Sequence, residues 1–301
     1  MNAPAGYSNR VYEMLRRYRI EGALFLATFA ITSAVFFFTG IRFANDDQFI
    51  TYRYIDNIAA GNGFVYNLGE HVLGATTPLF TLVGALLKFI FPHVATPTLV
   101  AAANIIFLSL AAVFFYALSR RFMSEWLAAA ATLVFALDLS KTIPEGMESP
   151  LFILLLLAFL HYLLSKKHYT ASVLLALTLL TRPDAGLIAV LVLIYWLLEV
   201  GWEKTVRLVA LCVAVALPWL VFSTWYFGSF VPQSLTAKLH SKDLYNVPAI
   251  QGVKVQLASY SRTYWGALYD PDNLILQTVF NLLPFLAFLA YGARKRLNRE
   301  T

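Results

Sequence analysis

Long apolar runs divide this chain, and they constrain its fold more than any other feature of the sequence. Nine such runs fall at about residues 20–40, 76–91, 97–118, 126–138, 150–164, 169–181, 185–200, 206–227 and 273–292. Several of them reach or approach the ~20 residues that an α-helix needs to cross a bilayer. Only 13% of the residues are charged, about half the fraction typical of a soluble domain. The sequence therefore predicts an all-α, polytopic membrane protein that forms a single module over residues 1–301.

The basic residues predict how these helices cross the membrane. If the short run at 76–91 lies at the interface and the other eight runs cross, every basic cluster falls on the cytoplasmic side, as the positive-inside rule requires. These clusters are the N-terminal segment 1–19, Arg120-Arg121, Lys166-Lys167, Lys204 with Arg207, and the tail 293–301. We therefore expect about eight transmembrane helices plus one interfacial helix in the first outer loop, 41–96.

This arrangement leaves the unusual polar residues on the outer side, in 41–96, in 139–149, at the turn 182–184 and in the last outer loop, 228–272. The single cysteine, Cys212, excludes a disulfide and a cysteine-built metal site. The formal charge of +6 does not indicate nucleic-acid binding, because the basic residues form short clusters between apolar runs.

Two adjacent carboxylates, Asp46 and Asp47, follow the first apolar run and open a segment in which Ile50, Tyr54 and Ile58 recur at helical spacing. A helix N-terminus at this point would favour the ionised carboxylates. The pair either caps this helix and marks the membrane boundary, or takes part in chemistry. Two carboxylates are also able to hold a divalent cation, although the sequence requires no cofactor.

Charged residues recur in the other outer segments. Glu148 precedes a predicted helix and is either its N-cap or a site carboxylate. Arg182 and Asp184 interrupt two apolar runs, either as a local ion pair in a turn or as a site where the arginine meets a phosphate. Lys238 is either solvated or a second phosphate contact. Carboxylates and cations at one membrane surface suit group transfer from an anionic lipid-linked donor, with a carboxylate as the base.

Several separated motifs follow this pattern. They are Asp46-Asp47-x-Phe49-Ile50-Thr51-Tyr52-Arg53-Tyr54, Gly61-x-Gly63-x-Val65-Tyr66-Asn67-x-Gly69-Glu70, Gly74-x-Thr76-x-Pro78-Leu79, Gly146-Met147-Glu148-x-Pro150-Leu151-Phe152, Arg182-Pro183-Asp184 and Tyr226-x-Gly228-x-x-x-Pro232-x-Ser234. Together they resemble the signatures of polytopic GT-C glycosyltransferases, in particular the bacterial branch that includes the mycobacterial terminal arabinofuranosyltransferases.

The resemblance implies a GT-C-like core and an inverting transfer of a sugar, arabinofuranose for example, from a polyprenyl-phosphate donor to a cell-envelope glycan or lipid acceptor. It implies a bacterial inner-membrane enzyme, embedded in membrane lipids, whose active site faces the periplasm and whose base is Asp46 or Asp47. The candidate substrate- and phosphate-binding residues are Arg53, Tyr54, Glu148, Arg182, Asp184 and Lys238. Many members continue with more helices and a soluble outer domain that helps to hold the acceptor. Compared with them, this sequence is expected to be either a minimal member or truncated, or a partner subunit supplies the acceptor site.

The alternative is a non-catalytic membrane protein, either a transporter or flippase for a lipid-linked glycan or an inactive subunit. A transporter is expected to carry ionisable residues near the middle of the membrane and repeated broken helices. The predicted spanning runs are almost free of charge, and the polar residues lie towards one side. This distribution favours chemistry at the membrane surface over transport.

Overall fold

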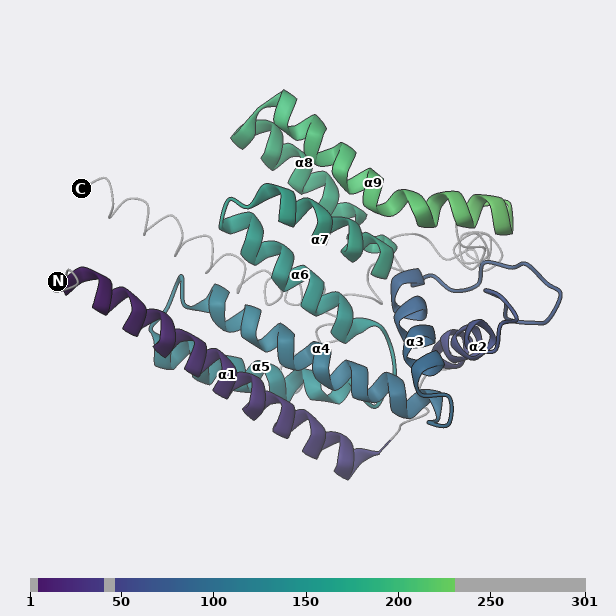
Figure 1. Ribbon diagram of the computed structural model, residues 1–301, viewed down its shortest axis with the longest axis horizontal. Coiled ribbons are helices and arrows are strands. Elements are labelled where there is room, and N and C mark those ends of the chain that lie inside the picture. The colour runs from purple at the N-terminus through teal and green to yellow at the C-terminus, as the bar shows by residue number, and fades with distance from the viewer. Residues whose placement is uncertain (1–4, 41–46, 231–301) are drawn as a thin grey trace, which may run out of the picture. The chain divides into compact units, whose positions relative to one another are not determined.

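The computed structural model describes residues 5–40 and 47–230, with side chains from residue 18 onward (Figure 1). This part of the chain is helical and contains no β-strand. Its α-helices are α1 (Ala5–Thr39), α2 (Asp47–Ala59), α3 (Pro78–Ile90), α4 (Thr96–Ser119), α5 (Glu125–Leu139), α6 (Ser149–Leu164), α7 (His168–Thr181), α8 (Gly186–Val200) and α9 (Trp202–Phe227). Two short 3-10 helices, η1 (Ser140–Thr142) and η2 (Pro183–Ala185), follow α5 and α7.

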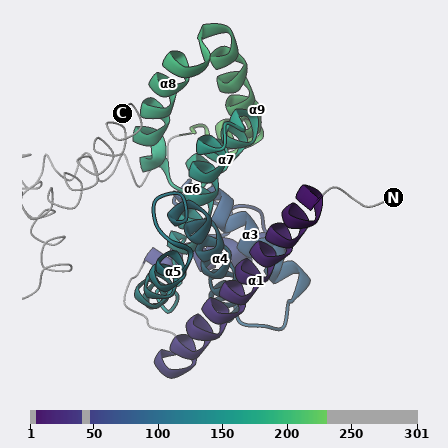
Figure 2. The same cartoon turned by 90° about the vertical axis from the view of Figure 1, so that its left-hand side faces the viewer.

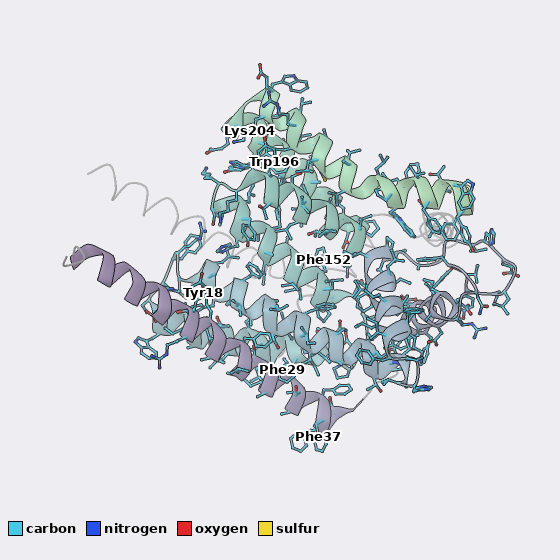
Figure 3. All side chains as sticks on the ribbon, in the orientation of Figure 1. Tyr18, Phe29, Phe37, Phe152, Trp196 and Lys204 are labelled. Carbon is cyan, nitrogen blue, oxygen red and sulfur yellow. The ribbon has the colours of Figure 1, made fainter. Side chains whose placement is uncertain are left out.

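Helix α4 lies at the centre of the packing, with α1, α5 and α6 against it (Figure 2). On its other side α6 packs against α7, and α7 packs against α9. Ala101, Ala111 and Ala112 of α4 are buried against its neighbours. Because these side chains are small, the neighbouring helices are able to approach α4 closely. Phe29 and Phe37 on α1 are instead exposed, and Phe37 points away from the other helices (Figure 3). Such outward aromatic side chains are expected on a helix that faces lipid.

Four of the described helices are long and apolar enough to cross a membrane: Tyr18–Thr39, Thr96–Ser119, Pro183–Val200 and Trp202–Phe227. The predicted spans at 126–138, 150–164 and 169–181 form α5, α6 and α7, with 15, 16 and 14 residues. At 1.5 Å per residue these helices are about 21–24 Å long, less than the ~30 Å hydrocarbon core. The predicted count of eight spans is therefore not confirmed, and the run at 273–292 lies outside the described residues.

The connections between helices gather at two ends (Figure 1). One end holds the turns at 120–124 and 165–167, where Arg121 donates from Nη1 to the Leu164 carbonyl (3.0 Å) and from Nη2 to Ser165 Oγ (2.6 Å). The other, which we call the α2 end, holds α2, α3, residues 139–149 and residues 182–185. Three of the predicted outer segments therefore lie together, whereas the fourth, 228–272, falls almost wholly outside the described residues.

Helix α3 has the length and surface expected of the predicted interfacial helix. It begins at Pro78, whose fixed φ suits a first helical turn, and it runs at a steep angle to α4 (Figure 1). Leu82, Leu86 and Phe89 form an exposed apolar stripe. On the opposite side, Gly84 faces α2, where a Cβ atom would overlap the Ile55 side chain. The missing side chain at Gly84 therefore sets how closely α2 and α3 approach.

Aromatic packing against α9 holds the loop 61–75 beside α2. Pro218 interrupts the hydrogen bonding of α9, and the turns after it carry Trp219 and Phe227. The Phe64 ring lies 5.3 Å from the Trp219 ring and 5.7 Å from the Phe227 ring, measured between centroids. The fully buried Tyr54 of α2 lies 5.1 Å from Phe64. This cluster fixes the rotation of α2, and so the direction in which its polar residues point.

Candidate active site

Arg182 joins two segments of the α2 end. Its Nε and Nη2 donate to the Asp184 carboxylate at 3.1 and 2.9 Å, which is the local ion pair of a turn. Its Nη1 also donates to Glu148 Oε1 at 3.2 Å, across 34 residues of sequence. The guanidinium carbon lies 5.5 Å from the centroid of the Phe152 ring on α6. Figure 3 labels Phe152. The predicted local ion pair of Arg182 is therefore present and is joined by a contact to Glu148, whereas the phosphate contact of Arg182 stays a prediction.

Glu148 occupies the N-cap position of α6, but its side chain makes no capping hydrogen bond. Its carboxylate turns to Arg182 instead and is buried, with 8% of the side chain exposed. Burial raises the pKa of Glu148 above its ordinary value; the Arg182 charge opposes this shift, and the carboxylates of Asp184 and Asp47 add to it. The Glu148 side chain therefore does not cap α6 by a hydrogen bond, and its role as a site carboxylate stays a prediction.

Asp47 is the first residue of α2, and its side chain is exposed. Its carboxylate is close enough to Glu148 to raise the pKa of that residue. Ion pairs join Glu148, Arg182 and Asp184 between the start of α6 and the α7–η2 turn, and the first turns of α2 lie against the preceding Gly146. We call these three residues, together with Asp47 at the start of α2, the carboxylate–arginine cluster.

The other predicted site residues lie elsewhere or outside the described residues. Arg53 donates from Nε to the Tyr66 carbonyl at 3.2 Å. The Tyr54 hydroxyl donates to the Val72 carbonyl (2.6 Å) and accepts from the Gly74 amide (2.9 Å). Both side chains thus hold the loop 61–75 rather than joining the carboxylate–arginine cluster.

Asp46 and Lys238 lie outside the described residues. In the part of the chain that the structure describes, no group of three or more His, Cys, Asp or Glu side chains could hold a metal ion. The cation site predicted at Asp46 and Asp47 therefore stays a prediction.

Two residues that position Glu148 were not singled out by the sequence analysis. Asn104 on α4 is fully buried and donates from Nδ2 to the Met147 carbonyl at 3.0 Å, which fixes the turn before Glu148. Tyr52 on α2 reaches the same turn and contacts Gly146. The sequence did carry a sign of the role of Asn104, because Asn104 is the single asparagine in the apolar run 97–118 and a buried polar side chain in such a run needs a hydrogen-bond partner.

We expect Gly146→Ala to destabilise the protein through this contact. Gly146 has a φ of +63°, and a Cβ atom there would overlap the Tyr52 hydroxyl. Overpacking of this kind costs about 1–3 kcal/mol, or about 2–5 °C in melting temperature for a chain of this size. The control is Gly61→Ala, with a φ of +81° and no atom within 4 Å of the point where its Cβ would lie. Equal melting temperatures of the two variants in detergent would show that the Tyr52 contact does not restrain this turn.

The raised pKa of Glu148 also predicts a pH-dependent stability. Because the folded-state pKa lies above the ordinary 4.5, folding favours the protonated form, and the free energy of unfolding falls as pH rises through the folded pKa. Glu148→Gln mimics the protonated carboxyl and escapes this loss. We therefore expect the melting temperature of Glu148→Gln, relative to wild type, to increase from about pH 4 to about pH 7. The exposed Glu203→Gln is the control, and a difference that stays constant with pH contradicts the prediction.

The chain is similar to the terminal beta-(1->2)-arabinofuranosyltransferase of Mycobacterium tuberculosis (strain ATCC 25618 / H37Rv), with 27% identity over 268 residues. The match covers 80% of this chain but 41% of that protein, so the chain spans about two-fifths of the length of the curated relative. No family model and no solved structure matches the chain. The similarity agrees with the resemblance that the outer-loop motifs indicated.

Proposed function

We propose that this chain is a membrane glycosyltransferase that moves a sugar from a polyprenyl-phosphate donor to a cell-envelope glycan or lipid acceptor. The bacterial inner membrane is the proposed location, with the α2 end on the outer face. The proposal rests above all on the position of the carboxylate–arginine cluster next to an apolar cavity. The similarity to an arabinofuranosyltransferase supports the same class of reaction and makes arabinofuranose the first sugar to test.

The apolar cavity has a volume of about 430 Å³ and lies between the loop 73–78, the end of α7 and the middle of α9. Leu73, Pro78, Leu180 and Trp219 are among the residues that line it. Pro183 also lines it and directly follows Arg182, so the cavity reaches the backbone next to the proposed phosphate-binding residue. Burying an isoprenoid tail here would contribute roughly 0.8 kcal/mol for each CH₂ group removed from water.

Arg182 retains hydrogen-bonding capacity for the phosphate. A guanidinium has five N–H groups, and contacts to described residues account for three of those of Arg182. Its side chain is 36% exposed, so a ligand is able to reach the remaining two. Glu148 and Asp184 hold the guanidinium in one orientation, and it would stabilise the charge that develops on the departing phosphate.

The proposed reaction is a single displacement at the anomeric carbon. The acceptor hydroxyl oxygen bonds to this carbon while the bond from the carbon to the phosphate oxygen breaks, and its electron pair leaves with the phosphate. The hydroxyl proton goes to a carboxylate, for which Asp47 and its neighbour Asp46 are the candidates. Attack opposite the leaving phosphate inverts the configuration. The energy of the sugar–phosphate bond drives the transfer, so no nucleotide is needed, and the divalent cation predicted at Asp46 and Asp47 stays a prediction.

The proposal is tested by incubating the full chain in lipid nanodiscs with a panel of polyprenyl-phosphate sugars and following each donor by mass spectrometry. We expect one donor to be consumed and to yield polyprenyl phosphate. Binding of a donor without consumption, with and without added glycan acceptor, would favour the non-catalytic alternative or a partner subunit that supplies the acceptor site. If the chain neither binds nor consumes any of the donors, the proposal is wrong.

A further inference from the structure

A second, larger cavity lies beside α2 and has no part in the reaction described so far. Its volume is about 830 Å³, within the ~300–1,000 Å³ typical of ligand sites. It lies between α2, the C-terminal half of α3 with the following turn, and the start of α4. The loop 61–75 and the apolar cavity next to Arg182 contribute none of its lining residues.

Three aromatic rings form the apolar part of this cavity. Phe49 and Tyr52 of α2 meet edge to face, with ring centroids 6.0 Å apart. Phe89 of α3 is 72% exposed and lines the cavity from the other side. Aromatic walls with a few placed polar groups are the usual composition of a small-ligand site. A sugar ring matches such walls because its C–H face packs on an aromatic ring while its hydroxyls stay free to hydrogen bond.

The polar part of the cavity combines one carboxylate with one ammonium. Oδ1 of Asp56 accepts a hydrogen bond from the Thr96 hydroxyl, and within residues 47–230 no hydrogen bond occupies Oδ2. Nζ of Lys88 donates to the carbonyls of Pro92 (3.1 Å) and Val94 (2.8 Å), two of its three possible bonds. The two formal charges cancel. This balance favours a neutral ligand with both donors and acceptors over a phosphate or a cation.

The cavity also adjoins the carboxylate–arginine cluster. The Tyr52 ring lines the cavity, and its hydroxyl contacts Gly146, two residues before Glu148. Phe49, another lining residue, is two residues beyond Asp47. Asp56 lies nine residues from Asp47, about 13.5 Å along α2, so a glycan held by Asp56 would have to extend over this length of the helix for a hydroxyl to reach the proposed base.

We propose that this cavity binds the saccharide acceptor, as a neutral glycan whose sugar ring packs on Phe89 and hydrogen-bonds to Asp56. This inference rests on the proposed glycosyltransferase function. It assigns to this chain an acceptor subsite on α2, α3 and α4, where the sequence analysis had considered a partner subunit. Asp56 and Phe89 select and hold the acceptor and do not touch the reacting atoms.

The test measures binding of an octyl arabinofuranosyl disaccharide to the full chain in nanodiscs by saturation-transfer NMR, without donor. We expect Asp56→Asn to weaken binding about tenfold or more, because a hydrogen bond to a charged acceptor is lost. Phe89→Leu keeps an apolar surface for lipid but removes the flat ring, and should weaken binding severalfold. In a transfer assay both variants should raise the acceptor KM and leave kcat and hydrolysis of the donor near wild type.

Thr96→Val is the matched control, because it removes the hydrogen bond to Asp56 and keeps the carboxylate. We expect it to bind the disaccharide like wild type. If it weakens binding as much as Asp56→Asn, then Asp56 merely fixes the start of α4 and the inference is wrong. A different result would assign the cavity to a lipid headgroup and overturn the inference. In that result glycerophosphoethanolamine displaces the disaccharide from wild type, and glycerophosphoethanolamine no longer binds to Phe89→Leu or Asp56→Asn.

The two proposals fail in different ways. Donor hydrolysis by wild type without disaccharide binding would overturn the acceptor subsite and leave the transferase function standing. Disaccharide binding that depends on Asp56 and Phe89, in a protein that consumes no donor, would support the subsite while contradicting the transferase function.

Discussion

Asp47→Asn is expected to lower sugar transfer by about 10²–10⁴-fold, the range that a positioned general base contributes. Asparagine keeps the size of the side chain and its place at the start of α2 but cannot take up a proton. Asp47 is exposed and lies near the buried Glu148, so the substitution should change the melting temperature little. Donor binding, measured by mass spectrometry on the nanodisc complex, should also stay close to that of wild type.

Two further variants make this prediction decisive. Asp138→Asn removes another exposed carboxylate, the ion-pair partner of Lys141, and should retain full transfer. Asp46→Asn separates the two members of the acidic pair. If Asp46→Asn abolishes transfer and Asp47→Asn does not, Asp46 is the base. If both variants transfer sugar like wild type, the pair is a helix cap and the proposed mechanism is wrong.

Arg182→Lys is expected to weaken donor binding and to reduce kcat by about 10²–10³-fold, the usual effect of removing a group that stabilises transition-state charge. Lysine keeps the positive charge but not the planar fork that holds Asp184 with two N–H groups while a third reaches Glu148. Both effects appear in the transfer assay, as a higher donor KM and a lower kcat. The matched control is Arg121→Lys, at the opposite end of the bundle, where the guanidinium also bonds to two turn residues.

A loss of folding must be distinguished from a loss of phosphate recognition. Arg182→Gln leaves the Glu148 carboxylate buried without its ion-pair partner. Because Arg182 is more than a third exposed, we expect a cost below the ~3–5 kcal/mol measured for fully buried pairs. The double variant Arg182→Gln with Glu148→Gln should regain melting temperature but not transfer. Recovery of transfer in the double variant would show that Arg182 serves only to neutralise Glu148.

The local structure of this chain could be predicted because it depends on neighbouring residues. Apolar runs become helices, since a helix satisfies its own backbone hydrogen bonds, and the described helices α3 to α9 lie at the predicted runs. The spacing of Ile50, Tyr54 and Ile58 predicted α2, and Tyr54 is fully buried on its inner face. The positions of the basic residues also indicated which connections share an end of the bundle.

The lengths of the helices were less predictable, because the apolar character of a run does not show at which residues turns end the helix. The runs at 126–138, 150–164 and 169–181 give helices of 14 to 16 residues, which are bounded by polar turns. Hydropathy measures how apolar a segment is, whereas crossing a bilayer also requires length.

The tertiary structure alone decided which polar residues meet. Glu148 had an equally local explanation as an N-cap, and its pairing with Arg182 depends on the packing of α6 against α7. The place of Asp47 beside Glu148 depends on the rotation of α2, which Phe64 and the aromatic turns of α9 fix. The sequence determined which residues carry charge and in which segments, because composition and helical period are local properties. Their convergence into one site depends on contacts between helices far apart in the chain, which no local pattern records.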